Sequence, residues 1–309
     1  MGNVESNLAM TGRNCKQGLR LDSILGYTIR LLLAASALLQ MSTTIRAAHI
    51  DVAGDTLEIP SPIGFSAITP KMVAIFDFQT KSWPESAVHY LTFIQDFEVP
   101  VALKNEIPDM ERRLAVTTVR EVVGKTVRRS DFAELKSVFI SSNEKLAEQI
   151  KQTLPDEMEK QSKRMSAQAG ASVKMDIPQS VRYPPHDDSE RSFAISTLNS
   201  FTQTGSDGKP TFKTVSVTTS YLHVRGKLLV LYAYGEKDAL TWTRDTSKHW
   251  ADAILAANPD EKSSAAGSTQ SRSRDIDWVG TAVIGLLTAG LWGAFAVIRK
   301  QQANRQKKD

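Results

Sequence analysis

The chain has 309 residues and a formal net charge of +4, a length that allows one large or two small domains. The surplus of basic residues lies at the two ends, beside apolar runs, and acidic residues outnumber basic ones between them. A nucleic-acid-binding function is therefore not expected, because it needs a basic surface on the folded part. The one cysteine, Cys15, excludes a disulfide framework and a CxxC motif.

Residues 1–47 are typical of a signal peptide or an N-terminal anchor. A basic leader precedes the short apolar run Leu31–Met41, and small residues follow it. The run is too short to span a bilayer, and extending it backward would place Arg30 in its middle. Cleavage after Ala47 or Ala48, cleavage at the competing small-residue site Ala35-Ser36-Ala37 and an uncleaved anchor all stay open, and each places the next domain outside the cytoplasm.

A globular domain is expected over 48–258. In its first half, the pattern predicts a short strand at Thr56–Ile59 and a short helix at Lys71–Phe78. Two segments rich in β-branched and aromatic residues predict strands, Ala87–Gln95 and Arg113–Val122.

A long helix is expected to begin at Ser130, with acidic residues in its first turn. Apolar residues recur at helical spacing and predict one face packed on a sheet: Phe132, Leu135, Phe139, Leu146, Ile150 and Leu154. Pro155 ends or kinks this helix. The charged stretch Asp156–Gln168 is interpreted as a solvated helical extension, and Gly170–Ser189 as an irregular crossing.

The last part of the domain predicts a β unit followed by a helix. Strands are expected at Arg191–Gln203, Phe212–Val224 and Leu228–Tyr234, the last apolar on both faces. A final helix, Thr246–Ala257, places its apolar residues on one side. The expected fold class is α+β, a largely antiparallel sheet covered by helices as a sandwich, with one C-terminal transmembrane helix.

That transmembrane helix is predicted over residues 278–298, which contain no charge. As a helix, the segment is about 31 Å long, which matches the hydrocarbon core of a bilayer. A flexible linker (259–277) precedes it, and a basic tail (299–309) follows it and is expected in the cytoplasm. Small residues form a stripe on one face, which favours helix packing and a homodimer: Gly285, Ala289 and Gly293.

The segment Leu57–Phe65 (LEIPSPIGF) resembles the strand, proline, glycine and aromatic residue that open PsbP-like domains. The hairpin that ends in Leu228–Tyr234, with a tryptophan-bearing helix after it, is similar to the way those domains close. The resemblance covers the two ends of the domain, and the segment 130–189 departs from it. It implies an α/β/α sandwich in an exported bacterial protein of undetermined role, and it carries over no catalytic residue.

Candidate chemistry is sparse. The five histidines show no metal-ligand spacing, and the best metal candidate, His186-Asp187-Asp188 in a proline-rich loop, is interpreted as solvated. Ser142 and Lys145 match a serine–lysine spacing of acyl-transfer enzymes, but the partner SDN and KTG elements are missing. We expect no catalytic, metal or cofactor site.

His89 and His223 are expected to pack across strands. Five aromatic residues are expected to pack in the core or at the sheet edge, with a ligand groove as the alternative: Trp83, Trp242, Trp250, Tyr232 and Tyr234.

These patterns favour a non-enzymatic, single-pass membrane-anchored module that binds or scaffolds a component of a bacterial envelope. The alternative is an envelope hydrolase with a site assembled from distant residues, and a third hypothesis is a small-ligand carrier. The expected partners are the lipid bilayer, an envelope protein and a second copy of the chain. The expected location is the inner membrane, with the domain in the periplasm and the C-terminus in the cytoplasm.

Overall fold

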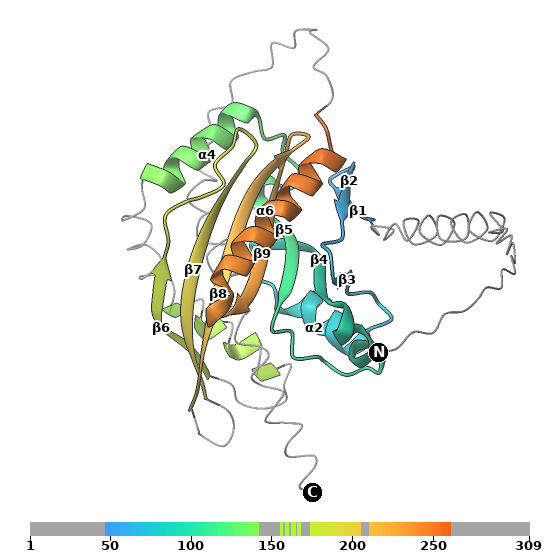
Figure 1. Ribbon diagram of the computed structural model, residues 1–309, viewed down its shortest axis with the longest axis vertical. Helices are drawn as coiled ribbons and strands as arrows, with labels where there is room; N and C mark the ends of the chain where they lie inside the picture. Colours follow the sequence, from blue (N-terminus) through green and yellow to red (C-terminus); the bar gives the residue numbers. More distant parts are fainter. Residues whose placement is uncertain are drawn as a thin grey trace, which may run out of the picture. The chain divides into compact units, whose positions relative to one another are not determined.

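The computed structural model describes residues 47–141, 174–204 and 210–260, together with short stretches at 155–156, 158–160, 162–164 and 166–167. All of them belong to one compact unit. The core of this unit is a seven-stranded sheet, with helices on both of its faces (Figure 1).

Every neighbouring pair of strands in this sheet is antiparallel. In spatial order the strands are β3 (Phe65–Ala67), β4 (Ala87–Gln95), β5 (Arg113–Val119), β9 (Lys227–Glu236), β8 (Pro210–Val224), β7 (Ser192–Thr204) and β6 (Lys174–Arg182). Strand β9 lies in the middle, and all its residues except Glu236 are buried. This burial agrees with a segment that is apolar on both faces.

The strands β8 and β9 form a long hairpin that closes through a tight turn. The register runs from Val215 opposite Glu236 to Val224 opposite Lys227. Arg225 and Gly226 form the turn with positive φ angles of 48° and 76°. Such a two-residue turn matches the twist of the strands that it joins.

One face of the sheet carries the helices α4 (Arg129–Ser141) and α2 (Val73–Ser82). The buried face of α4 consists of Phe132, Leu135 and Phe139, which confirms the predicted apolar stripe as far as Ser141. These rings pack against Phe193 and Tyr221 of the sheet.

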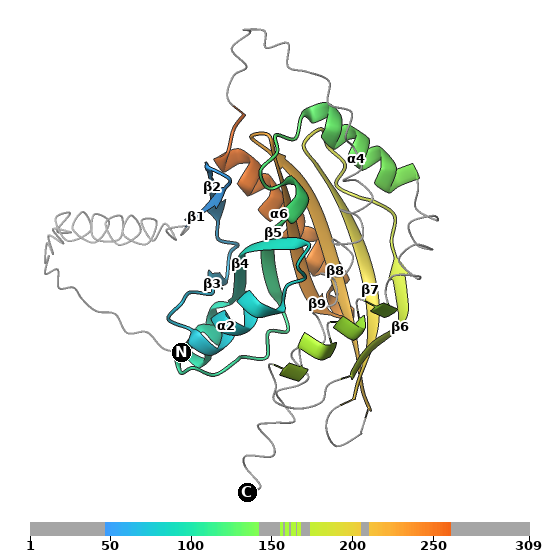
Figure 2. The same ribbon diagram turned by 180° about the vertical axis from the view of Figure 1, so that it is seen from behind.

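The other face carries helix α6 (Leu240–Ala257) and a two-stranded hairpin of β1 (Ala47–Val52) and β2 (Asp55–Pro60). Figures 1 and 2, drawn from opposite sides, place α6 in front of β8 and β9 and then behind them. Trp250 joins the helix to the hairpin, because its indole N–H donates to the carbonyl of Pro60 at 2.8 Å.

The structure differs from the expected elements at several places. Strand β6 lies where an irregular crossing was predicted, and α6 begins at Leu240 instead of Thr246. Strands β1 and β3 and the short helix α3 (Val99–Leu103) were not predicted. The strand at Ala87–Gln95 has the predicted bounds, and the strand from Arg113 ends three residues earlier than predicted.

The expected fold class needs a correction. In the part of the chain that the structure describes, no helix is long and apolar enough to cross a membrane. Helix α6, with 18 residues, is the longest helix among the described residues. One side of it is polar, because it carries Arg244, Asp245, Lys248 and Asp252. The predicted span 278–298 lies outside the described residues. We therefore correct the class to an antiparallel sheet with helices on both faces, without the membrane helix.

The predicted leader has no support either. Of residues 1–47, Ala47 alone is described, and it begins strand β1 opposite Pro60. Ala48, another candidate cleavage position, pairs with Ile59 in the same hairpin. We withdraw the signal peptide and the periplasmic placement that depended on it.

Candidate functional site

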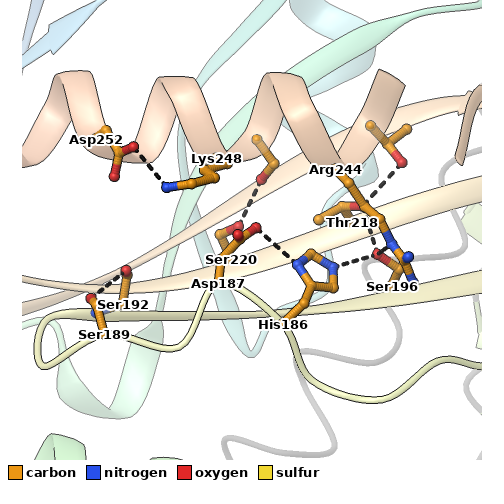
Figure 3. Close-up of polar contacts among 12 residues, drawn as sticks. His186, Asp187, Ser189, Ser192, Ser196, Thr218, Ser220, Arg244, Lys248 and Asp252 are labelled. Carbon is orange, nitrogen blue, oxygen red and sulfur yellow. Dashed lines mark hydrogen bonds and ion pairs between the residues drawn. The ribbon is translucent and has the colours of Figure 1, made fainter. Parts of the chain in front are cut away.

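Of the three residues of the predicted metal candidate, Asp188 separates from the other two in the structure. The backbone of His186 forms an isolated bridge with Ala194 of β7. Its Nδ1 lies 2.9 Å from Asp187 Oδ2, and its Nε2 lies 2.8 Å from Ser196 Oγ (Figure 3). Asp188 instead forms an ion pair with Lys136 of α4. Both ring nitrogens are therefore engaged, and the three side chains do not form a ligand set.

The contacts of Ser196 bring a serine, a histidine and an aspartate together in the order that nucleophilic enzymes use. The Oγ atom of Ser196 also lies 2.9 Å from Thr218 Oγ1 and accepts a hydrogen bond from Arg244 Nε at 3.1 Å. A hydroxyl has one proton and two lone pairs, so His186, Thr218 and Arg244 occupy all of them. Ser196 is also fully buried, which leaves no access for a substrate.

The same network continues along the first half of α6. Thr218 donates to Thr243 Oγ1 at 3.0 Å, and the hydroxyls of Ser220 and Ser247 lie 2.7 Å apart. All four hydroxyl-bearing residues are buried. Buried polar groups that are hydrogen-bonded to one another fix the position of the elements that carry them. We therefore assign the network a structural role, which is to hold α6 on β7 and β8.

A small pocket of about 260 Å³ lies beside this network. It is lined by side chains of the 187–192 loop and of α6, among them Ser192, Lys248 and Asp252. The ammonium of Lys248 pairs with Asp252 at 3.0 Å, which raises the pKa of Lys248 through the hydrogen bond and the charge of Asp252. The volume of this small pocket is below the usual range for ligand pockets, about 300–1,000 Å³.

A larger pocket, about 450 Å³, lies between α2 and β4. Its walls are formed by Ile68, Phe76, Gln79, Thr80, Trp83, Pro84, Glu85, the β4 residues from Ala87 to Thr92, and Arg120. Two local features open this space. Strand β3 pairs with β4 only over Phe93–Gln95, and the β4–β5 register shifts between His89 and Leu91. Hereafter we call it the α2–β4 pocket.

His89 is the histidine in the wall of the α2–β4 pocket. It stacks on Trp83, with ring centroids 5.0 Å apart and planes 13° apart. Burial lowers the pKa of His89 from 6.5 to about 4, and a hydrogen bond to the backbone of Leu91 opposes this shift only in part. The ring is therefore neutral at physiological pH.

A chain of hydrogen bonds fixes the ring of His89. Its Nε2 lies 2.8 Å from Thr92 Oγ1, and the Thr92 hydroxyl donates to Gln79 Oε1 at 2.9 Å. Because the proton of Thr92 points to Gln79, the Nε2–H of His89 is the donor to Thr92. Gln79 and Thr92 are both buried, so the inner wall of the pocket is a preformed hydrogen-bonded chain.

Arg120 stands at the edge of the α2–β4 pocket. Its Nε donates to the carbonyl of Glu85, and its Nη2 donates to the carbonyl of Ala87 at 3.2 Å. The ion pairs of the described residues do not include Arg120. Two backbone carbonyls thus hold a guanidinium in place, and no described carboxylate neutralises it.

The predicted aromatic residues divide between the core and the pocket. Trp83 lines the α2–β4 pocket, as the groove alternative proposed, while Tyr232 and Tyr234 are fully buried in the sheet. Trp250 packs under the β1–β2 hairpin, and Trp242 stacks on Phe65.

The two strand histidines also differ. His223 packs inside the protein, where its Nε2 contacts the carbonyl of Val127 at 2.7 Å and its ring lies 5.8 Å from Phe132. His89, in contrast, packs on Trp83 and also faces the pocket. Both rings are packed, but their contacts are with Trp83 at the end of α2 and with Val127 and Phe132 at α4, so packing across strands is not confirmed, and the position of His89 at the pocket was not predicted.

Several predicted residues cannot be compared with the structure. The serine–lysine pair Ser142 and Lys145 lies outside the described residues, and so does the helix-packing stripe of Gly285, Ala289 and Gly293. In the part of the chain that is described, no group of three or more metal-ligating side chains occurs.

No family model matches the chain, and the comparison with curated proteins gives no match. Among solved structures, it is similar to the Ran-binding protein Mog1p of Saccharomyces cerevisiae, with 11% identity and a TM-score of 0.24, over 70% of this chain and 93% of that one. It is also similar to PsbP (CyanoP) of Synechocystis, with 11% identity and a TM-score of 0.25, over 71% and 94%. PsbP is thus among the similar structures, but a TM-score this low carries no further argument.

Proposed function

We propose that this chain is a binding module whose ligand occupies the α2–β4 pocket. The observation that carries the proposal is the pocket itself, about 450 Å³ in volume and walled by aromatic and aliphatic side chains with a few fixed polar groups. Binding sites for small molecules generally combine this size with this kind of lining. The neutral ring of His89 and the charge of Arg120 are the two polar features that could orient a ligand.

Binding explains the pocket better than catalysis does. A nucleophilic enzyme needs a hydroxyl or thiol that a base activates. The hydroxyl next to His89 belongs to Thr92, which is 2% exposed and donates its proton to Gln79. His89 is a donor to Thr92 in this arrangement, so it does not act as a base toward it. The groups are satisfied among themselves and offer a rigid wall.

A screen of small aromatic and aliphatic fragments by protein NMR tests this proposal. We expect the amide shifts that the fragments cause in the protein to cluster on residues 76–83, at the end of α2, and on 87–92 of β4, because residues of both segments line the pocket. Shifts that cluster on the 187–192 loop and α6 would move the site to the smaller pocket. A complete screen without shifts on either segment would contradict a binding role for this pocket.

A second candidate function is hydrolysis at Ser196, which the contacts with His186 and Asp187 favour. The saturated and buried hydroxyl of Ser196 argues against it. A fluorophosphonate probe distinguishes the two functions, since it labels activated serines. We expect no label on Ser196. Labelling of the native chain that the substitution Ser196→Ala removes would favour the hydrolase.

A further inference from the structure

The charged side chains at the α2–β4 pocket are unequal in their surroundings. Its lining residues include one arginine, Arg120, and one glutamate, Glu85, and no lysine or aspartate, while burial keeps the ring of His89 neutral. Both side chains are exposed, and neither is in an ion pair of the described residues. Arg120 differs in that two backbone carbonyls accept hydrogen bonds from its guanidinium.

We propose that the ligand of this pocket is a small apolar molecule with one acidic group, and that Arg120 binds that group. This inference rests on the proposed function, and it adds the chemical class of the ligand. A guanidinium has five N–H donors. The carbonyls of Glu85 and Ala87 use the Nε donor and one Nη2 donor. Among the described residues, no hydrogen bond uses the remaining donors. They suit a carboxylate, sulfonate or phosphate, which Arg binds through paired hydrogen bonds.

Preorganisation supports this role for Arg120. A free arginine side chain loses rotamer freedom when it binds an anion, and this loss weakens binding. The two carbonyl contacts span 33 and 35 positions of sequence and fix the side chain before a ligand arrives. Arg120 therefore loses part of its rotamer freedom when the protein folds, and it loses less when the ligand binds.

The rest of the pocket suits an apolar body. Ile68, Phe76 and Trp83 offer aliphatic and aromatic surface, and the ring of His89 adds a flat wall. A second acidic group on the ligand would find no second cation among the lining residues and would approach the carboxylate of Glu85. The lining thus favours a single acidic group at the Arg120 end.

Two fluorescent probes that share a ring system test the ligand class: anilinonaphthalene sulfonate, which is acidic, and phenylnaphthylamine, which is neutral. We expect the native protein to bind the acidic probe more tightly. The substitution Arg120→Gln should weaken the acidic probe about tenfold, the effect of an exposed charge-assisted contact, and should leave the neutral probe unchanged. The substitution Glu85→Gln should strengthen the acidic probe severalfold, because it removes a repelling carboxylate.

A matched control is Arg112→Gln, because Arg112 is also exposed but lies over Trp242, outside the pocket lining. It should change neither probe. If Arg120→Gln leaves the acidic probe unchanged, or if Arg112→Gln weakens it equally, the proposed ligand class is wrong. If both probes bind in the pocket with equal affinity, the proposed ligand class is also wrong, while the proposed function stands. If neither probe binds but NMR finds neutral fragments in the pocket, the function stands and the ligand class fails.

Discussion

The histidines show how the surroundings of one residue type decide its role. His186 bridges Asp187 and Ser196 and fixes its loop against β7. His223 is buried and contacts the carbonyl of Val127. His89 stacks on Trp83 and faces a pocket. None of these roles follows from the local sequence, because each depends on a partner that the fold brings close.

The buried ring of His89 makes stability depend on pH. Its pKa is about 4 in the folded protein, and the ordinary value is 6.5. Between these values the unfolded chain binds more protons, so the free energy of unfolding decreases as the pH falls from about 6.5 to 4. We expect a loss of about 2–3 kcal/mol from this group, since its ring keeps some contact with solvent.

Chemical denaturation across this pH range measures the loss. The substitution His89→Gln should remove about this much of the decrease, whereas His49→Gln, at an exposed position of β1, should retain all of it. The same pH dependence in the native protein and in His89→Gln would contradict the assignment.

Phe193 joins the sheet to the buried face of α4. It is fully buried, stacks on Tyr221 with centroids 4.6 Å apart, and contacts Phe132 and Phe139 of α4. Phe193→Ala should lower the free energy of unfolding by about 3–5 kcal/mol, because it leaves a cavity. Phe212→Ala, at a position 74% exposed, should change it by less than about 0.5 kcal/mol. Equal effects in denaturant titrations would contradict this packing.

Among the elements, α6 is divided into two halves. Its second half packs through Trp250, Ala251 and Ile254, and its first half packs through the hydroxyls of Thr243 and Ser247. The sequence predicts the second half, because apolar residues repeat there at helical spacing. It does not predict the first half, because buried hydroxyls look the same as exposed ones in a sequence.

Gly235 sets how closely α6 approaches the end of β9. A Cβ at this position would lie 2.5 Å from the Cβ of Ala239 and 3.3 Å from Thr243. The substitution Gly235→Ala should therefore shift the start of α6 and destabilise the fold by about 1–3 kcal/mol. In thermal or chemical unfolding, Gly124→Ala is the control, because a Cβ there meets nothing within 4 Å. A neutral Gly235→Ala would contradict the close approach.

Strands were predicted where β-branched and aromatic residues are frequent, and β6, which contains a proline, was missed. Ala87–Gln95 has its predicted bounds, although the sequence does not reveal the register shift after His89 that helps to open the pocket. Strand β6 was missed because Pro178 lies inside it, next to another register shift. Proline usually occurs at edge strands and bulges, and β6 is the last strand of the sheet.

On the scale of the whole described molecule, a sheet covered on both faces has few places for a ligand. Helices α2 and α4 cover one face, and α6 with the β1–β2 hairpin covers the other. The α2–β4 pocket occurs where this cover ends, beside the three-residue strand β3. The antiparallel sheet follows from the sequence pattern, but the pocket depends on where strands stop and how helices meet them, which the pattern does not encode.

The central claim is that the α2–β4 pocket binds a ligand, and filling the pocket tests it most directly. Thr80 lines the pocket from α2, whereas its exposed neighbour Lys81 does not. Binding of the NMR-identified fragments should therefore be lost in Thr80→Trp and retained in Lys81→Trp, with both variants folded. Fragments that bind Thr80→Trp as tightly as the native chain would show that the pocket is not the binding site.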